Sequence, residues 1–332
     1  MPRSPRPLPD TLGDCFRVGE AVDAGVSRAR LRAGDLEAPF RGVRIAARRD
    51  ASPMGEPVED EPVDGGPLAL DRRRQADVRE RARAYAVVAP AGSFFVGRTA
   101  AVLWGLPVSP GAELELGAWA PAHAPRARGV RGVKVMPELA TLREVSGFRV
   151  TSPASTWAML GRVLTVRELI VVGDAVVRVP RDRSGTRRPE RSLTTIPSLQ
   201  AAVDAGRRLG VARLREALTG IRVGSASPLE SEYRLDAERA GIPEPDLDRE
   251  IRDAAGRLLG ISEIVYPRWR VVVEIEGDHH RTSRRQWDRD IEKYAAYAAA
   301  GWEVVRLTAR HVRSAVGVEQ VAATLARRGW RP

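Results

Sequence analysis

The stretch from Gly260 to Arg281, which reads GISEIVYPRWRVVVEIEGDHHR, limits the possible folds more than any other part of the chain. Two runs rich in β-branched residues flank a Tyr-Pro-Arg-Trp sequence, which predicts two strands joined by a turn. Alternation along the second run places Glu274 and Glu276 on one face of a Val-rich strand. A carboxylate beside apolar neighbours must be paired or bind a cation. The pattern therefore indicates either a cation site or an edge strand whose acids face solvent.

The length of the turn decides where Glu263 lies. A two-residue turn pairs Tyr266 with Trp269 and sets Glu263 opposite Val272, on the face of Glu274, with Cβ atoms about 7 Å apart. A three-residue loop moves Glu263 to the other face. We take the first register as the prediction. It gathers these acids and imidazoles in one place: Glu263, Glu274, Glu276, His279 and His280.

Clustered carboxylates of this kind suit a hard divalent cation. Mg²⁺ takes one or two protein carboxylates and keeps most of its waters, and Mn²⁺ accepts the same ligands. An ion held there can activate water for attack on a phosphodiester and offset charge on the departing oxygen. The hairpin therefore predicts a Mg²⁺ or Mn²⁺ cofactor if the protein is an enzyme.

The order of motifs around the hairpin resembles the Vsr-like branch of the restriction-endonuclease fold. One acid on the first strand is followed by acid-x-acid, Gly and His, then a helix with Trp287 and Asp290, then GWEVVRLTA. The resemblance covers about residues 225–330 and implies a central mixed sheet and metal-dependent cleavage of DNA. It implies roles for four residues: Glu263 and Glu274 as metal ligands, Glu276 at the place of the usual lysine, and His280 as the histidine after the strand. The first acid is usually Asp in this group, whereas here it is Glu263.

Glu230 has two interpretations. Ser227, Pro228 and Glu230 form a capping-box sequence, which explains Glu230 as a helix-start residue. In the family that this block resembles, an acid on the first helix often completes the metal site, so Glu230 is also a candidate metal ligand. Both roles can hold together.

The helix predicted after the hairpin begins with basic residues. A DNA phosphate backbone can lie against them. The arginines predicted to contact it are Arg281, Arg284 and Arg285. Further along, Lys293 is predicted at the surface, and the alternative is that it replaces the missing strand lysine.

The composition of the chain limits the classes of binding partner that we expect. The 332 residues carry 54 Lys and Arg against 43 Asp and Glu, a net charge of +11, which favours a polyanion such as DNA. Cys15 is the only cysteine, which excludes an intramolecular disulfide and a cysteine-based zinc site. The sequence has neither a membrane-length apolar stretch nor the apolar core of a signal peptide, so we expect a cytoplasmic protein without a membrane partner.

The region from Thr11 to Ile45 reads as helix, turn, helix and strand. Ser27 can cap the second helix, which carries three arginines: Arg28, Arg30 and Arg32. The unit resembles the winged helix-turn-helix at the start of AbiEi-type antitoxins. That resemblance implies that the arginines contact phosphates or guanine edges. The alternative is a solvated basic face.

The whole chain is predicted to be an α/β (α+β) multidomain protein. Its segments are a winged helix-turn-helix at 11–48, an acidic, Pro-rich linker at 49–71, a mixed α/β domain at 72–222 and the nuclease-like domain at 223–332. The middle domain also resembles AbiEi-type proteins, which implies a cognate toxin or a defence partner. The basic run 181–191 is predicted to be an exposed loop, with nucleic-acid contact as the alternative.

Two functions follow from these patterns. The first is a DNA-binding, Mg²⁺-dependent endonuclease in which Glu276 or His280 orients or deprotonates the attacking water. The second is a transcriptional regulator or antitoxin whose nuclease fold has lost activity. The acids and the histidine favour the enzyme, whereas the Asp-to-Glu change and the missing strand lysine favour the regulator.

Overall fold

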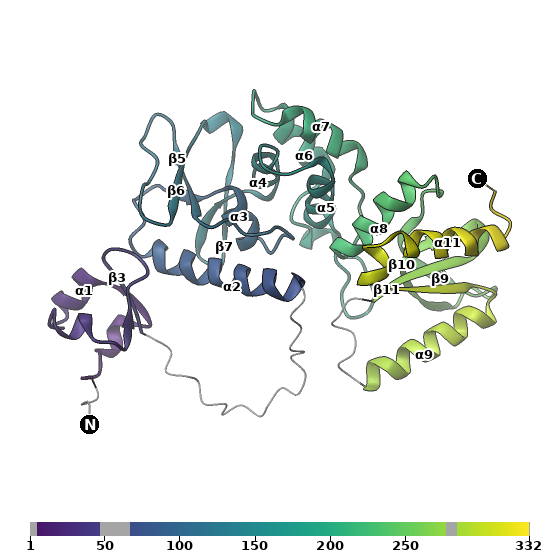
Figure 1. The fold of residues 1–332 in the computed structure, drawn as a ribbon, viewed down its shortest axis with the longest axis horizontal. Helices are drawn as coiled ribbons and strands as arrows, with labels where there is room; N and C mark the ends of the chain where they lie inside the picture. The colour runs from purple at the N-terminus through teal and green to yellow at the C-terminus, as the bar shows by residue number, and fades with distance from the viewer. Residues whose placement is uncertain (1–4, 47–66, 277–283, 332) are drawn as a thin grey trace. The chain divides into compact units, whose positions relative to one another are not determined.

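The computed structural model describes residues 5–46, 67–276 and 284–331, without the side chains of 67–71 and 284–289. The protein is mixed α/β, as expected, and the described residues form three separate sheets (Figure 1). Contacts within the chain divide it into two compact units, Met1–Met159 and Leu160–Pro332. The division falls inside the segment 72–222, so the predicted boundaries of that domain stay a prediction.

The N-terminal part contains a small sheet of order β1-β3-β2. Its elements are β1 (Cys15–Arg17), α1 (Val18–Asp23), β2 (Leu36–Glu37) and β3 (Val43–Ala46). Phe16, Ala21, Val26 and Leu31 form its core. Strand β3 agrees with the prediction, but the second helix is not found, because only a 3-10 turn, η2 (Arg30–Arg32), follows Ser27. A stretch this short cannot offset the cost of helix nucleation when it buries only Leu31.

The second sheet has the order β6-β5-β4-β8-β7. The elements of this region are α2 (Pro67–Ala86), β4 (Phe94–Phe95), α3 (Gly97–Leu103), β5 (Leu114–Trp119), β6 (Val130–Val135), β7 (Leu142–Val145), β8 (Phe148–Thr151) and α4 (Pro153–Leu160). Helix α2 starts at Pro67, inside the predicted linker, and proline suits a first helical position. Residues 49–66 of that linker lie outside the described residues.

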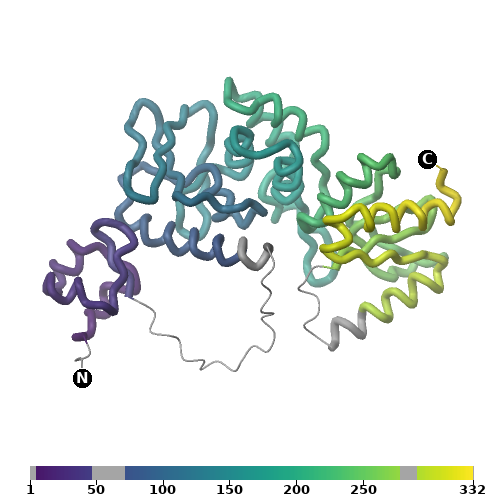
Figure 2. Tube along the Cα trace, viewed as in Figure 1, coloured from purple at the N-terminus to yellow at the C-terminus, as the bar shows by residue number. Residues whose placement is uncertain are grey.

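The second unit contains a helical segment followed by an αβ segment (Figure 2). Its helices are α5 (Val166–Val177), α6 (Ile196–Asp204), α7 (Val211–Gly220), α8 (Pro228–Arg239), α9 (Arg284–Ala299), α10 (Ala309–Val312) and α11 (Ala315–Arg327). Its strands are β9 (Asp246–Arg252), β10 (Leu258–Tyr266), β11 (Val271–Glu276) and β12 (Glu303–Thr308). They form a mixed sheet of order β12-β11-β10-β9, in which only β11 and β12 are parallel among the described strands.

Helices cover both faces of this sheet, with α8 and α11 on one face and α9 on the other (Figure 1). Tyr233 of α8 packs with Ile264 and Val273 in one core cluster. Tyr297 of α9 packs with Val265 and Val272 in another. Neighbouring strand residues therefore enter opposite cores, which is why β11 is Val-rich throughout. None of the helices in the described residues has the length and apolar content needed to cross a membrane.

Candidate active site on the C-terminal sheet

The hairpin between β10 and β11 has a longer turn than predicted. Tyr266 pairs with Val271, so the register with Tyr266 opposite Trp269 is wrong. Trp269 ends a 3-10 turn that begins at Pro267, and Arg270 adopts a left-handed φ of 51°. Local sequence does not reveal that Trp269 lies in the turn and not in β11, because a short apolar run is compatible with either structure.

Glu263 lies where the alternation of β10 changes. Val265 packs with Tyr297 beneath α9. Ser262 reaches the same face, because its hydroxyl donates to Glu274 Oε1 at 2.7 Å and shares a 3.0 Å hydrogen bond with the Tyr297 hydroxyl. Strict alternation would place Ser262 and Val265 on opposite faces, so the side-chain alternation is broken between them. The carboxylate of Glu263 accepts the Ile275 N–H at 3.3 Å.

Glu274 is buried in the middle of the sheet and is held by two donors. Its side chain accepts from Ser262 and from Lys293 Nζ, the latter at 2.9 Å. Lys293 comes from α9 and lies about equally far from the rings of Tyr294 (5.6 Å) and Tyr297 (5.5 Å). The prediction of a surface position for Lys293 is therefore wrong. Its side chain is only 22% exposed.

Glu230 is a buried acid at the start of α8, as the helix-start interpretation predicts, and its role as a metal ligand stays a prediction. It is 1% exposed at the start of α8. Ser227 caps the helix by accepting the Glu230 N–H at 3.3 Å, while the Glu230 carboxylate accepts the N–H of Ala226 at 2.7 Å instead of that of Ser227. The same carboxylate lies close enough to Glu274 for the charge of Glu274 to raise its pKa.

The three carboxyl groups form an acid cluster of Glu230, Glu263 and Glu274. Burial raises the pKa of Glu263, and the charges of Glu230 and Glu274 raise it further, against the lowering effects of the Ile275 N–H and Lys293. Burial is also the main cause of the raised pKa of Glu230. Glu230 and Glu263 therefore hold protons more tightly than free carboxyls do, and a cation placed beside them would relieve the repulsion.

Ser262 and Lys293 already donate hydrogen bonds to Glu274, which limits how the acid cluster can bind a metal ion. Among the described residues, no group of three or more His, Cys, Asp or Glu side chains is arranged to hold a metal ion. Two carboxylates are enough for Mg²⁺, which keeps several waters. Glu263 and Glu274 fit that requirement by residue type, and Lys293 supplies the cationic charge beside them. His280 lies outside the described residues.

Glu276 contacts a different side chain from those around the acid cluster. Its carboxylate accepts from Arg306 Nε of the parallel strand β12 at 2.5 Å. Arg306 in turn lies over the ring of Tyr294 at 5.4 Å. Glu276 is half-buried and forms an ion pair with Arg306.

The predicted DNA-binding arginines differ in their surroundings. Arg28 and Arg32 are exposed. Arg30 forms two hydrogen bonds with Asp35, at 2.8 and 2.7 Å, and a third with the Arg6 carbonyl at 2.5 Å, so its guanidinium is used inside the unit. Arg284 and Arg285 start helix α9 with side chains outside the described part, and Arg281 lies wholly outside it.

Comparison with known proteins adds two relatives. No family model and no solved structure matches the chain. The chain is 29% identical over 188 residues to a protein in each of two strains of Mycobacterium tuberculosis, and both carry the name uncharacterized protein. The matched region is 57% of this chain, and the chain spans 64% of the length of these relatives.

Proposed function

We propose that the second unit is a divalent-metal-dependent nuclease that hydrolyses DNA phosphodiesters. One observation carries the proposal: buried Glu274 has Lys293 Nζ at 2.9 Å, and the charges of Glu230 and Glu274 both raise the pKa of Glu263. Four elements, α8, β10, β11 and α9, each supply one of these side chains. Buried ionisable groups whose pKa values are shifted by specific neighbours are typical of functional sites.

The residues of the acid cluster have distinct proposed roles. Glu263 and Glu274 would hold Mg²⁺ or Mn²⁺. When bound, such an ion supplies Lewis-acid stabilisation of the phosphoryl charge and activates water. Ser262 fixes the orientation of Glu274 through its 2.7 Å hydrogen bond. Glu276 or His280 accepts the proton of the attacking water.

Lys293 stands in for the strand lysine that this chain lacks. Lys134 and Lys293 are the only lysines among 54 cationic residues. Lysine differs from arginine because it is a compact charge that can give up its proton when its surroundings favour this. Lys293 donates to Glu274, which supports a role in which its positive charge stabilises the reacting phosphate.

The positive net charge of the chain supports DNA as the substrate. The net charge of +11 favours association with a nucleic acid. We propose that the N-terminal part is a winged-helix-like DNA-binding unit that uses Arg28 and Arg32, and that Arg281, Arg284 and Arg285 contact the phosphate backbone. The setting would be cytoplasmic, with a toxin–antitoxin or defence partner.

A second candidate function is a DNA-binding regulator with an inactive nuclease fold. The observation that favours it is the pairing of the acids inside the protein. Lys293 already neutralises Glu274, and Arg306 already neutralises Glu276. Internal pairs of this kind can keep a fold intact without any metal.

A nicking assay separates the two functions. Supercoiled plasmid is incubated with the full chain in Mg²⁺, in Mn²⁺ and in EDTA, and the same is done with Glu274→Ala. The nuclease predicts nicking that needs the metal and is lost in Glu274→Ala. DNA binding without nicking in any metal supports the regulator instead.

A further inference from the structure

A groove of about 820 Å³ lies between the loop 181–187 and strands β9 and β10. All of these residues belong to the second unit. Leu247, Leu258 and Ile261 give the groove its apolar surface, and Leu258 is 44% exposed. Arginine and acidic side chains of the loop and of β9 give it polar walls. The groove therefore offers both apolar and charged contacts to a ligand.

The groove and Glu263 of the acid cluster share a face of the sheet. A Cβ added at Gly185 would lie 2.9 Å from Ile261 Cδ1, so the loop lies directly over Ile261. Ser262 faces Tyr297 and α9, so its neighbours Ile261 and Glu263 point to the opposite face. Glu230, whose charge raises the pKa of Glu263, is on α8, which covers that opposite face. A strand bound in the groove would therefore pass within reach of Glu263.

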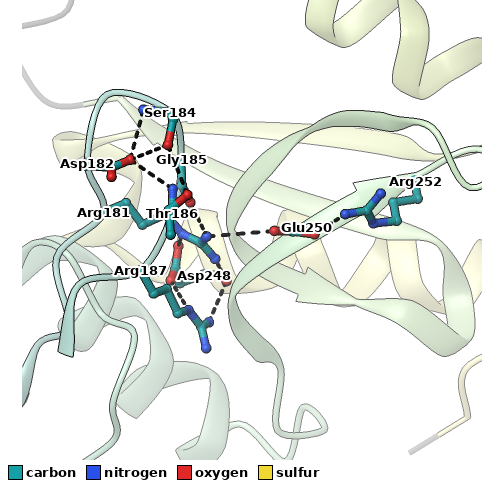
Figure 3. A network of polar contacts seen from close by, with 9 residues as sticks. All are labelled: Arg181, Asp182, Ser184, Gly185, Thr186, Arg187, Asp248, Glu250 and Arg252. Carbon is teal, nitrogen blue, oxygen red and sulfur yellow. Dashed lines mark hydrogen bonds and ion pairs between the residues drawn. The ribbon is translucent and has the colours of Figure 1, made fainter.

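Two arginines fix the loop to the edge of β9 (Figure 3). Arg181 Nε and Arg187 Nε donate to the two carboxylate oxygens of Asp248 at 2.6 and 2.9 Å. The Nη2 atoms of both arginines donate to the Asp248 carbonyl at 2.9 and 2.8 Å. Asp248 has a φ of 49°, a conformation in which its oxygens meet the loop. Arg187 is nonetheless 50% exposed, against 16% for Arg181, so it retains donors for a further anion.

The groove lining contains three arginines and three acids, and the segments that border it carry more cations than anions. Residues 181–188 and 246–257 contain seven arginines and five acids. Each acid has an arginine partner. These pairs are Asp182–Arg188, Asp246–Arg249, Asp248 with both Arg181 and Arg187, Glu250–Arg252 and Asp253–Arg257. Arg183 is exposed on the same loop. Arg187 lines the groove and Arg183 is exposed on the bordering loop, so both can contact a phosphate from solvent.

We propose that this groove binds a single strand of nucleic acid and leads it to the acid cluster. Arginine forks suit phosphate oxygens, while the apolar surface at Leu258 and Ile261 suits bases that are not stacked within a duplex. A duplex would present its phosphates but not its base faces. The inference rests on the proposed nuclease function, which would cleave the bound strand. It identifies single-stranded nucleic acid as the substrate class.

The first test is binding without cleavage. Affinity of the full chain for a labelled oligothymidylate is measured in EDTA over a series of salt concentrations. Arg187→Ala should weaken binding and lower the salt slope by about 0.7 for each phosphate that the variant no longer neutralises. Arg181 still pairs with Asp248 at 2.6 Å in this variant, so the loop keeps its anchor.

Arg239→Ala is the matched control. Arg239 is 77% exposed, pairs with Asp236 at 3.6 Å and lies at the far end of α8 from Glu230. The substitution removes the same charge without touching the groove and should leave the salt slope unchanged. Equal slopes and affinities for Arg187→Ala, Arg239→Ala and the unaltered chain would overturn the groove proposal.

A label in the groove separates it from the N-terminal part. Cys15 is the only cysteine, so Leu258→Cys on a Cys15→Ser background carries one fluorophore at an exposed groove position. Oligothymidylate should change its emission with the same Kd as in the first test. No change, or a change only with duplex DNA or with an acidic peptide, would contradict the proposal. Oligothymidylate binding in a chain that nicks no DNA would keep the groove and reject the nuclease.

Discussion

Lys293 Nζ lies 2.9 Å from Glu274 Oε1, which joins the middle of helix α9 to the most buried acid of strand β11. The side chains are 22% and 11% exposed, so water screens this ion pair less than a surface pair. Glu274 also accepts from Ser262, which satisfies a second lone pair. The site therefore has a fixed cation beside its carboxylates.

Removing that cation should destabilise the protein. Lys293→Met leaves Glu274 buried with the Ser262 hydroxyl as its neutral donor, and we expect the free energy of unfolding to fall by about 1–3 kcal/mol. Adding Glu274→Gln to Lys293→Met should recover part of the stability, because the buried charge is gone. Urea unfolding of both variants measures this. A double variant no more stable than Lys293→Met would contradict the expected coupling.

Stability without metal should fall as the pH rises through the titration of Glu263. Its pKa is raised above the ordinary 4.5, so the folded state binds more protons than the unfolded state in that window. This contribution is fully present below pH 4.5 and is lost as the pH passes through the raised pKa. Glu263→Gln should flatten the fall. Thermal unfolding in EDTA between pH 5 and pH 8.5 tests this, and an identical pH dependence in the variant would contradict it.

Divalent ions should stabilise the folded protein through the acid cluster. Because only the folded state brings Glu263 and Glu274 together, Mg²⁺ at about 100 times its Kd should add about 2.7 kcal/mol. Glu274→Gln should respond less to Mg²⁺ and, because it leaves Lys293 without its carboxylate partner, be less stable without metal. The measurement is the melting temperature with and without Mg²⁺. An equal Mg²⁺ response in the variant would place the bound ion elsewhere.

Asp174 of α5 and Arg234 of α8 form a buried ion pair that should matter more than an exposed one. Their side chains are 1% and 3% exposed and lie 2.8 Å apart, so Asp174→Asn leaves a buried unpaired charge and should cost about 3–5 kcal/mol. Asp236→Asn breaks a bidentate pair with Arg167 that is 28% and 35% exposed and should cost about 1 kcal/mol or less. Urea unfolding compares the two variants, and similar decreases in stability would contradict this ranking.

The arginines near Ser27 should have two different roles, DNA contact and stabilisation of the fold. Arg28→Ala and Arg32→Ala together should lower the salt slope for duplex DNA by about 0.9 for each phosphate left without a cation, because both side chains are exposed. Arg30→Ala should instead lower the stability of the N-terminal part, because it removes the two bonds to Asp35. Binding titrations and thermal unfolding distinguish them. A salt slope unchanged by the double variant would remove the DNA-contact interpretation.

Local patterns are sufficient to predict most elements of the second unit. The two strands of the hairpin, the cap at Ser227 and the helix after the hairpin all correspond to observed elements. The break in alternation near Glu263 is not predictable from local sequence, because it depends on the contact between Ser262 and Tyr297. The inward position of Lys293 depends on the same long-range packing. Its one signal in the sequence is a lysine kept in a chain whose other cations are almost all arginine.

The carboxylates around Glu274 are central to the proposed cleavage of DNA. The most direct measurement is the initial rate of plasmid nicking at saturating Mg²⁺ for Glu274→Gln and for Glu303→Gln, each compared with the unaltered chain. Glu303 is a half-buried acid on β12 that pairs with Arg327 and Arg328, outside the acid cluster. We predict that Glu274→Gln abolishes nicking and that Glu303→Gln retains it. Equal rates in both variants, or no nicking by the unaltered chain, would contradict a catalytic role for Glu274.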